Sequence, residues 1–299
     1  MSKHVHIDRP FIGILFMLGF CVLAPLGDTL AKVLGGRLDL GILVLTRFAA
    51  QAAILLPIAL LSRAALVMRG RVLALVTTRT LLHIAGISTM FTSLRFLPLA
   101  DALAITFVMP FVMLLLGRFV LGEEVGPHRL WASVVGFAGT LLVIQPNFAE
   151  VGAPALLPVG VALFFALFML VTRQIAKEVD PVALQAVSGL QASAILLPAL
   201  ILLPDLPGSG LAAFELATGW LLLALGSVGT AAHLLMTWSL RFAPASPLAP
   251  MQYLEIPIGT VIGWLIFRDL PNGLAALGIL VTIGAGLYII LRERRLARS

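Results

Sequence analysis

Ten long apolar segments, separated by short stretches rich in charge, proline or glycine, make up most of this 299-residue chain. Each is close to the roughly 20 residues that a helix needs to cross the hydrocarbon core of a bilayer. The segments are continuous rather than alternating, which favours helices over a membrane β-barrel. The predicted spans are residues 11–34, 40–61, 77–96, 99–120, 128–146, 154–174, 181–203, 216–240, 246–267 and 273–291.

Composition agrees with a membrane environment. Hydrophobic residues are 60% of the chain, charged residues are 11%, and the mean hydropathy is +1.08. Soluble domains carry roughly 25% charged residues. The net charge of +6 comes from bases between the apolar segments, so membrane topology explains it and no nucleic-acid partner is expected. The first segment is too long for the hydrophobic region of a signal peptide, about 7–15 residues, and we expect it to be retained.

The distribution of Lys and Arg predicts the orientation. With the N-terminus on the cytoplasmic side, fifteen of these residues fall in cytoplasmic segments and four in external ones, which leaves Arg47 inside a span. Such a bias is typical of cytoplasmic loops. The sequence therefore predicts a multi-pass protein with both termini in the cytoplasm.

An internal repeat divides the chain. Residues 93–123 recur without a gap at 239–269, each copy beginning with SLRF, and AILLP at 53–57 recurs at 194–198. Glu123 and Asp269 end the two copies. We predict two homologous halves, residues 1–147 and 148–299, and an all-α fold of ten transmembrane helices.

The odd number of spans in each half matters for function. Because five spans precede the second half, each of its helices must cross the membrane in the opposite direction from its counterpart. Arg95 and its repeat partner Arg241 are therefore expected on opposite sides. Inverted repeats of this kind place the substrate site of secondary transporters near the midplane, between the halves.

The repeated turns and helix ends carry a family resemblance. LRFLPLADA and LRFAPASPLAP, with the helix ends GRFVLGEE and GWLIFRD, resemble the EamA family of the drug/metabolite transporter superfamily, in particular its aromatic-amino-acid exporter branch. The LGE of the first half has no match in the second, where Arg268 and Asp269 stand in its place. The resemblance implies a metabolite exporter that works by alternating access and whose relatives export amino acids.

Polar residues inside the spans mark the candidate pathway, because an ionisable side chain near the bilayer centre costs about 2.5–3.5 kcal/mol. They concentrate in the third, eighth and ninth spans. The predicted substrate-binding residues are His83, Met90, Thr230, His233, Trp238, Gln252, Tyr253 and Glu255. Each histidine could equally be a structural residue that forms hydrogen bonds between helices.

Charged residues within the spans leave alternatives open. Glu255 is a candidate for binding a substrate amine or a proton, or else a buried structural carboxyl. Asp28 is a second candidate proton site, although Lys32 one turn later could simply pair with it. Arg47 lies close enough to the outer end of its span for the side chain to reach the interface. Phe165 and its neighbours could line an apolar wall, or could belong to the core.

Prolines and glycines within the predicted helices suggest where helices bend or pack closely. Pro110 and Pro257 occupy neighbouring positions in the aligned repeats, each in the middle of a predicted helix. Proline there removes a backbone hydrogen bond, so each predicts either a fixed kink or a hinge. Glycines including Gly136, Gly284 and Gly286 are expected to allow close packing of helices.

Several classes of protein function have no support in the sequence. The chain has no Walker A loop, HExxH motif, GxSxG motif or paired Cys and His ligands, so we expect no enzyme, cofactor or metal. No lysine lies at mid-depth, which disfavours phosphate dianions as substrates. The leading hypothesis is a bacterial inner-membrane exporter of small metabolites, amino acids first, acting as a monomer. The alternatives are export of drugs or other amphipathic metabolites, and a non-transporting membrane scaffold or enzyme.

Overall fold

In the computed structural model, residues 9–120, 122, 126–202, 216–244 and 248–296 are described, and this part of the chain contains helices and no strand. Glu123, which ends the first copy of the repeat, lies outside it. The helices are α1 (Pro10–Gly35), α2 (Leu40–Leu61), α3 (Gly70–Ser93), α4 (Leu99–Thr106), α5 (Met109–Val120), α6 (Pro127–Val151), η1 (Ala153–Leu156), α7 (Leu157–Ile175), α8 (Pro181–Leu202), α9 (Leu216–Phe242), η2 (Ala249–Leu254), α11 (Glu255–Phe267) and α12 (Gly273–Leu296).

Each predicted span falls on helical structure. Within the described residues, eight helical segments are long and apolar enough to cross a membrane. The two remaining apolar helices, Met251–Phe267 and Gly273–Tyr288, are shorter and correspond to the ninth and tenth predicted spans. The chain is therefore a multi-pass helical membrane protein.

The fourth span is discontinuous, and the ninth changes from a 3₁₀ helix to an α-helix along its length. Between α4 and α5 the helix is interrupted at Phe107 and Val108, and a 3₁₀ segment, η2, precedes α11. The sequence predicted a mid-helix proline in each span. Pro110 instead lies in the first turn of α5, whereas Pro257 lies within the helical run that η2 and α11 form together. A first-turn proline such as Pro110 forfeits no helical hydrogen bond, so the fourth span is broken at Phe107 and Val108 and not by a proline kink.

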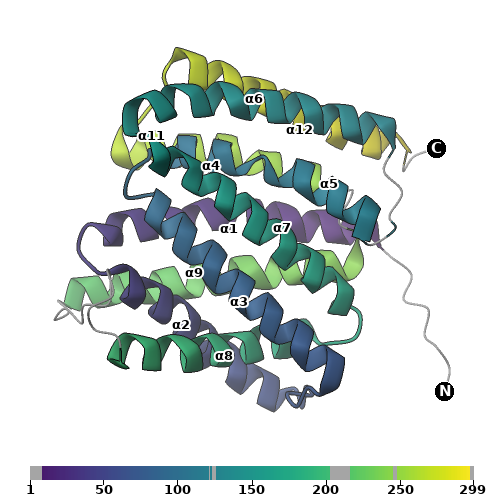
Figure 1. Cartoon of the computed structure of the whole chain (residues 1–299). Helices are drawn as coiled ribbons and strands as arrows, with labels where there is room; N and C mark the ends of the chain where they lie inside the picture. Colours follow the sequence, from purple (N-terminus) through teal and green to yellow (C-terminus); the bar gives the residue numbers. More distant parts are fainter. Residues whose placement is uncertain (1–8, 121, 123–125, 203–215, 245–247, 297–299) are drawn as a thin grey trace.

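Helices pack according to their places in the repeat. The most extensive contacts join α1 to α9, α3 to α7, α2 to α8 and α6 to α12. The α2/α8 and α6/α12 pairs unite a helix with its own repeat copy, whereas α1/α9 and α7/α3 are equivalent to each other. Figure 1 shows α6 with α12 along one edge of the bundle and α2 with α8 along the opposite edge.

The α6/α12 pair runs antiparallel. His128 at the start of α6 lies 2.7 Å from the hydroxyl of Tyr288 near the end of α12, while Gly139 meets Gly278 further along both helices. An added Cβ on Gly139 would lie 2.7 Å from the Gly278 carbonyl oxygen. Such close approach of two backbones is what small residues allow in membrane helix pairs.

Two glycines also form a slot for Tyr253. A Cβ on Gly136 of α6 would lie 2.6 Å from the Tyr253 hydroxyl, and one on Gly286 of α12 would lie 2.6 Å from the Tyr253 Cβ. Tyr253 is 1% exposed. The slot fixes η2, which directly precedes Glu255. Gly284, in contrast, faces open space and makes no such contact, contrary to the sequence-based expectation.

We therefore expect Gly286→Ala to destabilise the protein by about 1–3 kcal/mol, because the new methyl group overpacks the slot. Its matched control is Gly284→Ala on the same helix, where an added methyl group meets no neighbour. Thermal unfolding in detergent should show a lower midpoint for the first variant and an unchanged or higher midpoint for the second. Equal midpoints would contradict the slot.

Two faces of the bundle are distinguished below. The terminal face includes the start of α1 and the end of α9, where the Arg9 amide donates to the Phe242 carbonyl at 2.8 Å. The distal face includes the end of α1 and the turn between α3 and α4. On the distal face Arg95 donates to the Leu38 carbonyl at 3.1 Å. Its repeat partner Arg241 donates to the Val179 carbonyl at 3.0 Å, on the terminal face.

Candidate functional site

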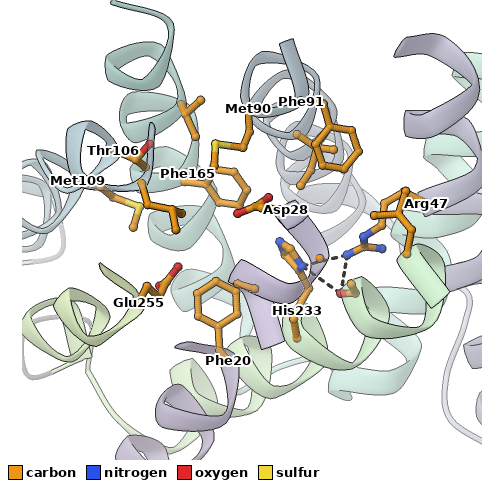
Figure 2. A pocket seen from close by; sticks show the side chains of 18 residues that line it. Phe20, Asp28, Arg47, Met90, Phe91, Thr106, Met109, Phe165, His233 and Glu255 are labelled. Carbon is orange, nitrogen blue, oxygen red and sulfur yellow. Dashed lines mark hydrogen bonds between the residues drawn. The ribbon is translucent and has the colours of Figure 1, made fainter. Parts of the chain in front are cut away.

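A pocket lies in the middle of the bundle, toward the distal face. Helices from both halves line it, including both segments of the interrupted fourth span and the first residue of α11 (Figure 2). The lining residues are Phe20, Ala24, Gly27, Asp28, Arg47, Ile87, Met90, Phe91, Leu103, Thr106, Met109, Val161, Phe165, Leu225, Gly229, Ala232, His233 and Glu255. Most of this wall is apolar, so its few polar groups determine which ligand it can orient.

Two carboxylates face the pocket from different helices. Glu255 is 7% exposed, and its Oε1 atom has no hydrogen-bond partner among the described residues. Asp28 on α1 makes no hydrogen bond or ion pair within 4 Å in the described part of the chain; the charge that acts on it most is that of Arg47. Buried charges are normally paired. A ligand with a positive group would complete this site.

The proposed pairing of Asp28 with Lys32 is not what the structure contains. The Lys32 ammonium group lies 3.3 Å from Asp269 and donates to the Leu97 carbonyl at 3.1 Å. It also lies 4.8 Å from the centre of the Phe267 ring. Lys32 thus joins α1 to the α3/α4 turn and to the end of α11 on the distal face, and leaves Asp28 to the pocket.

Because three contacts meet at Lys32, we expect Lys32→Met to loosen the distal face, even though a half-exposed ion pair alone contributes about 0–1 kcal/mol. The test uses Leu225→Cys in a Cys21→Ala background, which has no other thiol. Labelling by an impermeant thiol reagent should become several-fold faster when Lys32→Met is added. Arg71→Gln, which removes the exposed Arg71–Glu178 pair, is the control. Equal rates would show that Lys32 does not hold this face closed.

Arg47 is the fixed cation of the pocket. Its side chain is 1% exposed, and it donates to Gln51 at 3.0 Å and to the Gly229 carbonyl at 2.6 Å. Its Nη2 atom also lies 2.9 Å from Nδ1 of His233. The expectation that Arg47 reaches the membrane interface is therefore wrong. α9 packs against α2 at Gly229, and this contact turns the guanidinium group inward.

The Arg47 contacts continue into a network of amides. The Gln51 side-chain nitrogen donates to the side-chain oxygen of Gln185 at 2.9 Å. Gln185 in turn donates to the His233 carbonyl at 2.8 Å and to the Thr237 hydroxyl at 2.7 Å. These neutral partners hold Arg47 in position without cancelling its charge. It therefore remains available to an anionic group.

Four of the predicted site residues line this pocket: Asp28, Met90, His233 and Glu255. His83 lies behind the wall, with its ring 4.3 Å from that of His233. Neither ring nitrogen of His83 has a hydrogen-bond partner in the described residues. The alternative of a histidine hydrogen-bonded between helices therefore does not describe His83.

The remaining predicted residues lie elsewhere. The Thr230 hydroxyl donates to the Gly226 carbonyl, Trp238 packs 5.4 Å from Phe16, and the Gln252 amide lies 3.2 Å from the sulfur of Met169. Tyr253 occupies the glycine slot. Of the three predicted residues on α9, Thr230, His233 and Trp238, only His233 lines the pocket.

The aromatic wall is also divided. Phe165 lines the pocket with Phe20 and Phe91, whereas Phe168 lies deeper, 4.5 Å from the His83 ring. Two flexible side chains, Met90 and Met109, complete the apolar surface (Figure 2). Such a wall suits a ring or another flat apolar body.

Fold and pocket together define a multi-pass helical membrane protein. Its pocket lies between helices of both halves and combines an aromatic wall with a few charged side chains. The sequence profile of the EamA-like transporter family matches residues 11–145 and again residues 153–292. This chain belongs to that family. It is a small-metabolite transporter of the EamA type.

Individual relatives are similar over most of the chain. A riboflavin transporter of Rhizobium johnstonii is 30% identical over 227 residues, which cover 74% of this chain and 72% of the relative. An S-adenosylmethionine uptake transporter of Rickettsia prowazekii is 26% identical over 290 residues, which cover 95% and 94%. A solved crystal structure superposes with a TM-score of 0.69 at 18% identity, covering 96% of this chain and 98% of the other, and shows that the fold is shared.

Proposed function

We propose that this protein carries small zwitterionic metabolites with an aromatic or other apolar body, amino acids and amino-acid-like compounds first. One observation carries the proposal: Asp28, Glu255 and Arg47 converge on an aromatic-lined pocket without an ion pair among the described residues. An ammonium group would bind the carboxylates and a carboxylate would bind Arg47. Both charges of the ligand are then matched by fixed opposite charges.

The substrates in the names of the relatives suggest which compounds to test. S-adenosylmethionine has an amino acid end, a positive charge and an adenine ring, which match the two carboxylates, Arg47 and the phenylalanines. Riboflavin has a flat ring system but no ammonium or carboxylate group, so it would use the apolar wall alone. Amino-acid export, suggested by the sequence, uses the same groups as amino-acid-like uptake. Gradients across the membrane, and not the pocket, set the direction of flux.

For the mechanism we propose alternating access between two inverted five-helix halves, ten helices in all. The antiparallel contact of α6 with its repeat copy α12 supports inversion, and so do the matched bonds of Arg95 and Arg241. Interrupted spans at the site are common in such transporters. Pro110, next to the interruption of the fourth span, and Pro257, in the ninth, would act as hinges. We propose a monomer in the bacterial inner membrane with cytoplasmic termini.

The test is uptake by liposomes that contain only the purified protein. The panel is radiolabelled S-adenosylmethionine, tryptophan, phenylalanine and riboflavin, each with and without a pH gradient. We expect saturable uptake of at least one zwitterion, and competition among those zwitterions that are carried. Uptake of riboflavin alone would contradict the zwitterion proposal. No uptake of any compound, from folded protein, would favour a drug or another metabolite, and failure of those too would favour the scaffold.

A further inference from the structure

A second buried arginine lies on the other side of the histidine pair from Arg47. Arg79 of α3 is 0% exposed; its Nε donates to the Thr172 hydroxyl at 2.8 Å and its Nη1 to the Ser188 hydroxyl at 2.8 Å. It also lies 4.3 Å from the centre of the Phe168 ring. The sequence analysis counted Arg79 among the fifteen cytoplasmic Lys and Arg residues, but the structure buries it inside α3.

These partners of Arg79 are neutral. No carboxylate of the described residues lies within 4 Å of it. A cation in the membrane interior is costly and marks a functional position by default. Hydroxyl groups satisfy its protons but leave its charge uncompensated, which is the same condition in which the structure holds Arg47.

The repeat relates the two arginines. The AILLP offset of 141 positions carries Arg47 onto Ser188, which accepts a hydrogen bond from Arg79. The SLRF offset of 146 carries Arg79 onto Leu225, which lines the pocket beside Arg47. The α2/α9 interface contains Arg47, which α2 contributes. The repeat-equivalent interface, between α8 and α3, contains Arg79, which is contributed by α3, the counterpart of α9. Arg47 lies toward the distal face and Arg79 toward the terminal face.

Buried histidine nitrogens without hydrogen-bond partners among the described residues lie between Arg47 and Arg79. The His233 ring beside Arg47 contacts the His83 ring, which lies one helical turn from Arg79. Nε2 of His233 and both ring nitrogens of His83 have no hydrogen-bond partner in the described residues. Three unsatisfied buried nitrogens are costly in one closed conformation. They are accounted for if another conformation opens this region to water or ligand.

We propose that Arg79 binds the anionic group of the substrate when the pocket opens toward the terminal face, as Arg47 would when it opens toward the distal face. The inference rests on the proposed function and assigns a second anion site to it. In this structure the hydroxyls of Thr172, Ser188 and Thr237 accept hydrogen bonds from the guanidinium group. A substrate carboxylate would replace them, because a charged acceptor forms a stronger bond than a hydroxyl.

The first test needs no substrate. In the Cys21→Ala background, Ser188→Cys probes the Arg79 position and Leu225→Cys probes its repeat counterpart. Vesicles of each orientation are treated with impermeant methanethiosulfonates, one anionic and one cationic. We expect Leu225→Cys to react from the distal face and Ser188→Cys from the terminal face. Failure of Ser188→Cys to react from either side, while Leu225→Cys reacts, would make Arg79 a structural residue and overturn the proposal.

The charge of the reagent tests the anion site itself. At Ser188→Cys the anionic reagent should be favoured, and adding Arg79→Gln should lower the ratio of anionic to cationic rates about tenfold, since a nearby fixed charge concentrates ions of opposite sign. Arg79→Lys should preserve most of the ratio. A ratio that Arg79→Gln leaves unchanged would refute anion binding, even if the position is accessible.

Sided kinetics link the site to transport. With a zwitterion that the wild type carries, Arg79→Gln should raise the KM by about tenfold on the terminal side only, as expected for a charge-assisted hydrogen bond. Arg47→Gln should do so on the distal side only. Equal increases on both sides would refute the assignment. Labelling as expected without uptake of any zwitterion would refute the proposed substrate class but leave the alternating exposure of Arg79 standing.

Discussion

Glu255→Gln is expected to reduce uptake of a zwitterionic substrate by at least about tenfold, because a hydrogen bond to a charged group contributes about 1.5–3 kcal/mol. The carboxyl group is buried at the first residue of α11, and it faces the pocket. Glutamine keeps the size of the side chain but cannot attract an ammonium group. The measurement is initial uptake rate against substrate concentration in proteoliposomes.

The same variant tests whether Glu255 is a proton site. A carboxylate that gains a proton on one side and loses it on the other couples transport to a pH gradient, and glutamine cannot do this. We expect the residual transport of Glu255→Gln to lose its response to the gradient. Asp28→Asn, compared in the same assay, shows which of the two carboxylates carries this coupling.

Glu178→Gln is the matched control for loss of a negative charge. Glu178 is on the surface and pairs with Arg71 at 3.2 Å, an exposed contact of small energetic value. Its transport should equal that of the wild type. Wild-type rates across the pH range for both Glu255→Gln and Asp28→Asn would rule out a role for the pocket carboxylates.

Arg47→Gln is expected to have an effect of similar size, and on charged substrates only. Removing the guanidinium group should raise the KM for a substrate with a carboxylate by about tenfold or more. A ligand without a carboxylate, such as riboflavin if it is carried, should be affected far less. Equal losses for both kinds of substrate would indicate a collapsed pocket and contradict a specific role for Arg47.

Gly229→Ala tests the same cation without removing it. An added Cβ would lie 2.7 Å from Cζ of Arg47, so the guanidinium group would have to move from its carbonyl and histidine partners. We expect a smaller rise in KM than for Arg47→Gln, with protein yield unchanged. Gly219→Ala is the control on the same helix, because its Cβ meets no neighbour and should leave the KM unchanged.

Much of the fold could be predicted because the bilayer restricts the choices. An apolar run in lipid must form a helix, so each predicted span falls on helical structure. The interruption before Pro110 and the 3₁₀ segment before Pro257 could not be predicted in detail. Proline is equally compatible with a mid-helix kink and with a first turn, and the choice depends on what packs around it.

The site was predictable only in part, for a related reason. The cost of burying a charge identified Glu255 and Asp28 as candidates, and both line the pocket. The same cost was misjudged for Arg47 and Arg79, because a sequence does not show whether an arginine near the end of a span points to the interface or inward. For Arg47, the sequence did contain one indication of an inward orientation: Gln51 lies one helical turn away and can accept a hydrogen bond from it.

By itself, the sequence determined the membrane class, the helical architecture and the family, because these follow from hydropathy, span length and motifs along the chain. The tertiary structure alone decided which polar groups meet. Lys32 binds Asp269 and leaves Asp28 to the pocket, and Gly229 turns Arg47 inward. These outcomes depend on contacts between residues that are about 180 to 240 positions apart. No local pattern in a sequence specifies which of two nearby charges such a distant partner will take.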